Sequence, residues 1–390
     1  MKKQVLIIIG AIVVLILILI WSYLLFVGTP KSTDEVFTEL GMNGETETII
    51  PPAEETKKNP TVDIASSKLR QLTTKPVIGF REVIDKDSTR PTLLYVEAGT
   101  GHIYSIDLQT GEERRVSGTT IPQAIKAKIS PDGQHFAISS ASNTKGKPLF
   151  VGTLNPTTDS LDEKLNENVS DFTFGDNNEL MFSTNGTSGL EAYSYDIVKD
   201  IKKSIFSLPF HEAVIQWGNT ATSTHYTYPK TSYLLEGFLF EIKNGKMNRL
   251  PFAGYGFSAL VNDDMILYNA ITKQKPTTFV YLKGTNETKP LKTVLITEKC
   301  TLPQKGFIFF CAHEPIDTPY EFPDEWYRGS LSFKDSIWIL FADQFISGEL
   351  INTFTESGRE IDGINLTKEM ENGAMYFTNK NDNTLWMYEL

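Results

Sequence analysis

The sequence predicts an all-β protein, a seven-bladed β-propeller of four-stranded antiparallel blades, preceded by one N-terminal transmembrane helix. Three observations carry this prediction. A short β-branched and aromatic stretch recurs at intervals of 41 to 58 residues, turn-forming residues separate pairs of such stretches, and an unbroken apolar segment lies near the first residue. A unit of about 45 residues that contains four short strands has the length of one propeller blade.

The N-terminal segment has the features of an uncleaved membrane anchor. Lys2 and Lys3 precede the apolar residues 5–27. A helix of this length reaches ~34 Å at ~1.5 Å per residue, which is enough to cross a bilayer. Residues 26–30 (FVGTP) make a poor cleavage site, which favours a signal anchor over a cleaved signal peptide. The two lysines predict a single-pass protein with residues 1–4 in the cytoplasm and everything after the anchor extracytoplasmic, at the bacterial cell surface or in the periplasm.

Residues 28–65 differ in character from the segments on either side. They are rich in Thr, Glu and Pro and poor in aromatic side chains. Such a segment buries too little apolar area to offset its ordering entropy, so we expect a flexible tether with a root-mean-square span on the order of 35 Å. The alternative is a recruitment motif around Val36 and Phe37.

The third strand of each blade gives the clearest repeat. Residues 102–108 (HIYSIDL) are the reference example. A second series of strands, which starts with TLLYVEA at Thr92, precedes this one by 10 to 14 residues in every unit but one. Turn residues such as Asn185-Gly186 separate the two strands, as in a β-hairpin. The six relatives of HIYSIDL begin at Pro148, Glu191, Gly237, Thr278, Ser336 and Thr384.

An inner strand and a polar outer strand complete the predicted unit. Residues 127–139 show the inner strand best, with Pro131-Asp132-Gly133 as the turn that follows it. Counting these units gives seven blades within a propeller domain of residues 66–390. The chain stops inside the third strand of the seventh blade, so we expect residues 68–74 (KLRQLTT) to supply its outer strand and close the ring. Outer strands are predicted at 112–117, 201–207 and 246–252.

The Ser130-Pro131-Asp132-Gly133 motif resembles the PD40-type, TolB-like repeat of bacterial, WD40-like β-propellers, and residues 66–390 are compatible with that family. Other blades depart from the motif, with residues 175–178 and 262–264 in its place. Residues 299–338 are also similar to a segment of uncharacterised membrane-anchored propellers of small-genome bacteria. The resemblance implies the fold and no particular activity, because this superfamily holds enzymes, receptors and scaffolds.

Blade six carries an insertion at residues 313–335, because its second and third strands begin 30 residues apart. The connection between these strands lies on the same face as the blade-to-blade loops, which is commonly the binding face. Aromatic side chains beside charges suit sugar stacking or peptide anchoring. The alternative is that the insertion packs down as a lid and buries its aromatic side chains. The predicted ligand-binding residues are Asp324, Glu325, Trp326, Tyr327 and Arg328.

Cys300 and Cys311, the only cysteines of the chain, lie at the base of this insertion. If Lys305-Gly306 forms a two-residue hairpin turn, the two cysteines face each other across the hairpin, within disulfide range. The extracytoplasmic topology supplies an oxidising compartment. We therefore predict a disulfide, with two buried free thiols as the alternative. No metal site is expected, because two cysteines and His313 fall short of four ligands.

The composition and motifs narrow the function. A net charge of −11 without a Lys/Arg cluster after the first residues argues against a nucleic-acid partner. No phosphate-binding loop, zinc motif or nucleophile elbow occurs, and no cofactor is expected. The leading hypothesis is a non-enzymatic binding or scaffold module of the cell envelope, with a protein, peptide or glycan ligand. The alternative is a propeller hydrolase or lyase that acts on cell-wall glycans or peptides with carboxylates at the central channel.

Overall fold

The structure of the protein is a computed structural model, which describes residues 68–84, 91–141, 147–155, 158, 160–301, 303–315, 321–369 and 373–390. The predicted cytoplasmic residues 1–4, anchor 5–27 and tether 28–65 lie outside these ranges. No helix among the described residues is both long and apolar enough to cross a membrane.

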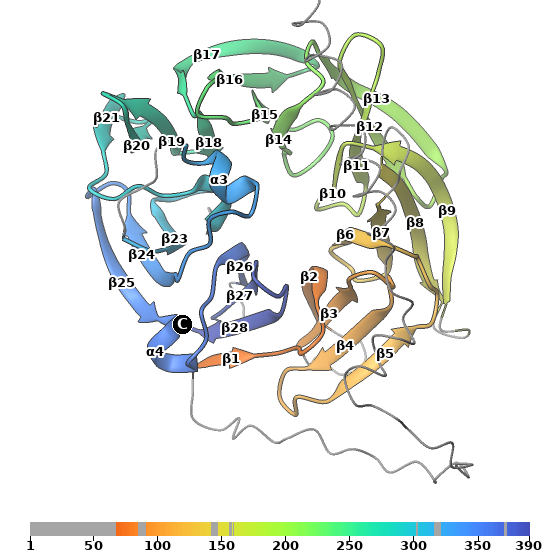
Figure 1. The fold of residues 1–390 in the computed structure, drawn as a ribbon. Helices are drawn as coiled ribbons and strands as arrows, with labels where there is room; N and C mark the ends of the chain where they lie inside the picture. Colours follow the sequence, from red (N-terminus) through yellow and green to blue (C-terminus); the bar gives the residue numbers. More distant parts are fainter. Residues whose placement is uncertain are drawn as a thin grey trace, which may run out of the picture. The chain divides into compact units, whose positions relative to one another are not determined.

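Within these residues the strands form seven four-stranded antiparallel sheets arranged in a ring, which confirms the predicted seven-bladed propeller (Figure 1). Blades one to three are β2 (Val77–Ile84), β3 (Pro91–Glu97), β4 (Ile103–Asp107) and β5 (Glu113–Ser117); β6 (Ala124–Ile129), β7 (His135–Ser140), β8 (Lys147–Asn155) and β9 (Ser160–Val169); and β10 (Asp171–Phe174), β11 (Leu180–Asn185), β12 (Leu190–Asp196) and β13 (Ile201–Leu208).

The remaining blades follow the same order from the first strand to the fourth, and blade seven takes its fourth strand from the N-terminal side. They are β14 (Ala213–Gln216), β15 (His225–Pro229), β16 (Glu236–Lys243) and β17 (Lys246–Tyr255); β18 (Ser258–Val261), β19 (Met265–Thr272), β20 (Lys275–Leu282) and β21 (Glu287–Pro290); β22 (Cys300–Thr301), β23 (Ile308–His313), β24 (Ser336–Phe341) and β25 (Ile346–Asn352); and β26 (Gly363–Glu369), β27 (Ala374–Asn379), β28 (Leu385–Glu389) and β1 (Leu69–Gln71).

The ring is closed by β1, which pairs with β28 as predicted. The register places Leu69 opposite Tyr388 and Gln71 opposite Trp386. The Glu389 N–H donates to the Lys68 carbonyl oxygen at 2.9 Å. The closing strand is three residues long, shorter than the seven-residue segment that the sequence predicted.

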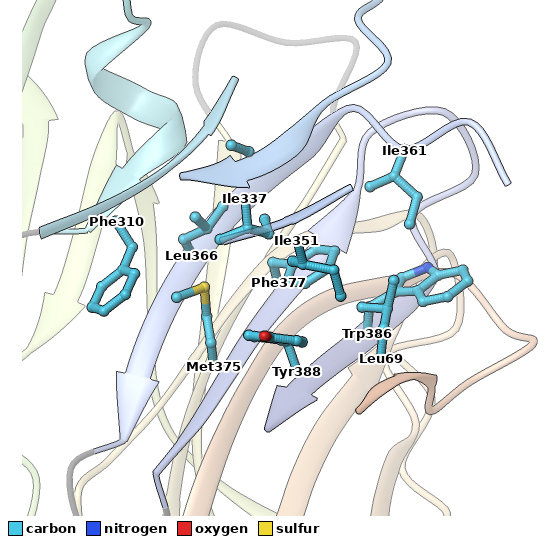
Figure 2. Close-up of a cluster of buried hydrophobic side chains, with 11 residues drawn as sticks. Leu69, Phe310, Ile337, Ile351, Ile361, Leu366, Met375, Phe377, Trp386 and Tyr388 are labelled. Carbon is cyan, nitrogen blue, oxygen red and sulfur yellow. The ribbon is translucent and has the colours of Figure 1, made fainter. Parts of the chain in front are cut away.

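The hydrophobic core lies between neighbouring blades, because both faces of each sheet are covered. The second strand of a blade is therefore apolar on both faces, and all six residues of β27 are buried. A fourth strand borders solvent and is polar, as in β5, where the first three residues are exposed. Between blades six and seven, Phe310 and Ile337 pack with Met375 and Phe377 (Figure 2).

In blades two and three, the turn between the first and second strands contacts the next blade, on the face opposite the blade-to-blade loops. In blade two, Asp132 accepts hydrogen bonds from the Ser130 hydroxyl at 2.6 Å and from the Asn178 amide of blade three at 3.0 Å. In blade three, Asp176 accepts from the Asn219 amide of blade four at 2.8 Å. The turns that depart from Ser-Pro-Asp-Gly therefore keep the inter-blade contact of that motif.

Candidate functional site

The insertion in blade six contains one helical turn, α3 (Asp324–Tyr327). Figure 1 shows α3 on the inner side of blades five and six. We call the described residues 321–334 the lid. The lid, η1 (Thr297–Lys299) before β22, and the segment between α4 (Thr353–Ser357) and β26 lie on one face of the ring, since they contact one another. This is the face predicted for the insertion.

Trp326 points from the lid into the protein. Its side chain is only 4% exposed and packs with Ile296, Phe322 and Phe333. The indole Nε1–H donates to Oδ2 of Asp362 at 3.0 Å. The lid thus covers the protein with its largest aromatic ring facing inward, and that ring offers no open face for sugar stacking in this structure.

The other predicted ligand-binding residues remain at the surface of the lid. Tyr327 and Arg328 are exposed, and Asp324 and Glu325 are partly exposed. Arg328 pairs with Glu321 at 2.5 Å. The ligand-binding role of these four residues stays a prediction. A ligand that contacts them would bind at the outer surface of the lid.

Beneath the lid, Lys299 forms a buried charge cluster with Asp335 and Asp362. The lysine Nζ lies 2.5 Å from Oδ2 of Asp335 and 2.6 Å from Oδ1 of Asp362. All three residues are at most 1% exposed. A buried charge is tolerated only when it is paired and hydrogen-bonded. The burial of the two carboxylates therefore depends on Lys299, and the burial of Lys299 depends on the carboxylates.

Backbone and side-chain donors complete this cluster. The Gly363 N–H donates to Oδ2 of Asp335 at 2.7 Å, and the Phe333 N–H donates to Oδ2 of Asp362 at 3.3 Å. Lys380, from the loop between β27 and β28, donates to the carbonyl oxygen of Trp326 at 2.8 Å. Elements of blade six, blade seven and the lid therefore converge on the two carboxylates.

Burial changes the acid–base properties of two groups under the lid. It raises the pKa of the Asp335 carboxyl from 3.8 to about 7, although the Lys299 ammonium acts in the opposite direction. Oδ1 of Asp335 has no hydrogen-bond partner among the described residues, which also favours its protonated form. Burial and, secondarily, the charge of Lys299 lower the pKa of the His313 imidazole from 6.5 to about 4.

A cavity of about 10 Å³ remains between the lid and blade six. Its lining includes Lys299, His313, Phe333 and Asp335. This volume has room for about one water molecule, so the cavity is too small for a sugar ring or a peptide side chain. Any larger ligand must bind outside the lid or displace it.

The lid is also fixed to blades four and five. Oδ2 of Asp324 accepts a hydrogen bond from the Tyr233 N–H, in the loop between β15 and β16, at 2.6 Å. The Tyr327 hydroxyl donates to the carboxylate of Glu298, in η1. The outer surface of the lid is thus continuous with the loops of blade four.

The predicted disulfide between Cys300 and Cys311 is confirmed. The two cysteines are directly opposite in the antiparallel pair β22–β23, in the register expected from the hairpin. Both side chains are buried. Because Cys300 directly follows Lys299, the disulfide fixes the segment that carries the buried ammonium.

The sequence reasoning missed the charge cluster. Lys299, Asp335 and Asp362 each stand directly before a strand, where charged residues are normally solvated. One feature of the sequence could have indicated it. Each of the three residues is the last residue of a connection between strands, and all three connections are expected on the same face of the propeller. Among the described residues, no group of three or more His, Cys, Asp and Glu side chains is placed to hold a metal ion.

Comparisons with known proteins identify the class of fold. No family model and no curated protein sequence matches the chain. The chain is similar to the β-propeller domain of the Trilobed protease from Pyrococcus furiosus, with 12% identity and a TM-score of 0.51 over 81% of this chain and 95% of that domain.

Two further solved structures are similar. One is an oligogalacturonate lyase in complex with manganese, with 11% identity and a TM-score of 0.51 over 84% of this chain and 98% of the lyase. The other is the Cps50 (Swd1) β-propeller domain of Myceliophteria thermophila, with 9% identity and a TM-score of 0.53 over 83% of this chain and 99% of that domain. At these identities the likeness shows the fold alone. The chain is a seven-bladed β-propeller, consistent with its PD40-type resemblance.

Proposed function

We propose that this protein is a membrane-anchored, extracytoplasmic propeller that acts as a non-enzymatic binding or scaffold module of the cell envelope. The apolar segment 5–27 would anchor it, and its ligand would be a protein, peptide or glycan held on the lid face. One observation carries the binding role. The lid is fixed by contacts to several blades and yet presents Tyr327 and Arg328 outward, which makes it a preorganised surface.

The buried cluster supports a structural role beneath the lid. Lys299, Asp335 and Asp362 are engaged with one another and are shielded from solvent. The Asp362 carboxylate holds the lid by accepting hydrogen bonds from the Trp326 indole and the Phe333 N–H. In this role they position the binding surface and take no part in a reaction.

Membrane topology gives the first test. The full-length chain with a C-terminal tag is expected in the membrane fraction of cells, with the tag open to external protease. A tag that stays protected in spheroplasts, which lack an outer membrane, or a chain that fractionates without membranes, would overturn the anchored placement.

Ligand arrays give the second test. The full-length chain in nanodiscs is screened against glycan and peptide arrays, beside a Tyr327→Ala/Arg328→Ala variant. Loss of the wild-type signals in the variant is expected. Val198→Ala is the control, because Val198 is exposed in the hairpin between β12 and β13. If array signals survive in the double variant, the ligand binds at a site other than Tyr327 and Arg328 of the lid.

A second candidate function rests on the same cluster. Two carboxylates from different connections meet at Lys299, and the pKa of Asp335 is raised to about 7, a value suited to general acid–base work. A hydrolase or lyase would use them after displacement of the lid. Turnover of cell-wall glycans or peptides by the wild type, lost in Asp335→Asn while the fold persists, would favour this alternative.

A further inference from the structure

The lid and blade four together carry exposed apolar side chains. Leu234 and Leu235 are 65% and 60% exposed, Tyr255 is 53% exposed, and Tyr327 is 39% exposed. We call these four residues the lid patch. Isolated apolar side chains are common on surfaces, but adjacent leucines at a loop tip beside two tyrosines are typical of an interaction site.

The segments that carry the lid patch are hydrogen-bonded to one another. The Gly256 N–H, next to Tyr255, donates to the carbonyl oxygens of Ser232 at 3.1 Å and Leu235 at 3.2 Å. Tyr233, which precedes the two leucines, is hydrogen-bonded to Asp324 at the start of α3. These contacts hold the loop of blade four, the end of β17 and the lid against one another.

Carboxylates border the lid patch. Glu236 follows the leucines, Glu298 contacts the Tyr327 hydroxyl, and Asp324 and Glu325 lie in α3. None of these four forms an ion pair with a described residue. Oδ2 of Asp324 accepts from the Tyr233 N–H and Oε2 of Glu325 is buried, so Glu236 is the exposed carboxylate of the rim. The neighbouring cation, Arg328, is paired with Glu321. The surface is therefore apolar at its centre and negatively charged at its rim.

We propose that the lid patch binds a peptide segment of a partner protein in which large apolar side chains are flanked by Lys or Arg. Apolar side chains would cover Leu234 and Leu235, and the cations would meet Glu236, Asp324 and Glu325. A glycan fits the centre of this surface less well, since Leu234 and Leu235 offer apolar area and no hydrogen-bonding groups there. The inference rests on the proposed binding function and specifies its ligand.

The probe is a fluorescent twelve-residue peptide of alternating Lys and Leu, titrated into the full-length chain in nanodiscs by anisotropy. Two matched peptides replace every Lys by Glu or every Leu by Ser. We expect saturable binding of the first peptide and at least about tenfold weaker binding of the other two. Affinity should fall as salt rises, because Glu236 is exposed and Asp324 and Glu325 are partly exposed.

Two pairs of variants locate the binding. Leu234→Ser/Leu235→Ser is expected to weaken binding at least about tenfold, whereas Val198→Ser/Ile201→Ser, at the exposed hairpin of blade three, should leave it unchanged. Glu236→Gln/Glu325→Gln is expected to weaken binding and flatten its salt dependence. Glu112→Gln/Glu113→Gln in blade one is the charge control.

The outcomes separate this inference from the proposed function. Equal losses in the lid-patch and control variants would show non-specific attraction to an acidic protein and overturn the inference. Array signals from glycans that depend on Tyr327 and Arg328, without peptide binding, would also overturn it while leaving the binding function standing. If neither the arrays nor the peptides give a binding signal, both the proposed binding function and this inference are overturned.

Discussion

Lys299 and Asp362 lie 63 residues apart in the chain, and Nζ of the lysine is 2.6 Å from Oδ1 of the aspartate in the interior of the protein. Lys299 precedes the first strand of blade six and Asp362 precedes that of blade seven. The contact therefore joins two blades on the lid face. A buried ion pair gains little over apolar packing, yet removal of one partner leaves an uncompensated charge.

Loss of the buried ammonium should be costly. We expect Lys299→Met to lower the free energy of unfolding by about 3–5 kcal/mol at pH 8, where Asp335 is ionised, because two buried carboxylates would lack their cation. Denaturant titration measures this change. The control is Lys289→Met, which breaks an exposed pair with Glu287 and should cost less than about 1 kcal/mol. Equal costs would contradict a special role for Lys299.

Asp335 should make the protein less stable as the pH rises. Its folded-state pKa of about 7 lies above the usual 3.8, so the folded state holds this proton more tightly than the unfolded state. Its contribution to stability is full below pH 4 and declines towards pH 7. Asp335→Asn removes this decline. We expect the difference in unfolding free energy between variant and wild type to grow in favour of the variant as pH rises, by about 1 kcal/mol per unit at most.

His313 should act in the opposite direction. Its pKa of about 4 lies below the usual 6.5, so the unfolded state binds this proton more tightly. Stability from this group is lost as pH falls from about 6.5 to 4. His313→Gln should therefore retain more stability than the wild type at pH 4.5 relative to pH 7. Denaturation midpoints of the wild type and the two variants at four pH values separate the effect of Asp335 from that of His313. Parallel pH profiles for the wild type and His313→Gln would contradict a buried neutral imidazole.

The disulfide should stabilise the base of the lid. Replacement of Cys300 and Cys311 by Ala is expected to lower the free energy of unfolding by up to about 3 kcal/mol, because the bridge closes a short loop. Limited proteolysis should then cut within residues 313–335 before other loops. Thiol titration of the denatured wild type should give no free thiol before reduction, and two free thiols at that stage would contradict the bridge.

Closure of the ring should depend on Leu69. Its side chain is buried against Trp386 and Tyr388 between the two ends of the described chain (Figure 2). Leu69→Ala is expected to cost about 2–5 kcal/mol in a denaturant titration. Leu350→Ala, a partly buried change beside the same core cluster, should cost less.

The sequence predicted the features that depend on local chemistry. The recurring β-branched and aromatic strands, the turn residues and a closing strand within residues 68–74 follow from the hydrophobic pattern and hairpin geometry. The opposition of Cys300 and Cys311 follows from the register of their hairpin. The charge cluster could not be predicted in this way. Whether Asp362 is solvated depends on where Trp326 lies, and the direction of an aromatic side chain in a long loop is set by tertiary packing.

The short strand β1 has a mechanical consequence. The chain that leads from the predicted anchor joins the ring at Lys68, directly before β1, and three residues of β1 pair with β28. A pulling force along that chain therefore acts on the β1–β28 hydrogen bonds before it reaches the inner strands of any blade. Detachment of β1 would leave blade seven with three strands and release slack in the chain. With the predicted anchor held in a membrane, tension on the chain would reach the propeller first at the three-residue pairing of β1 with β28.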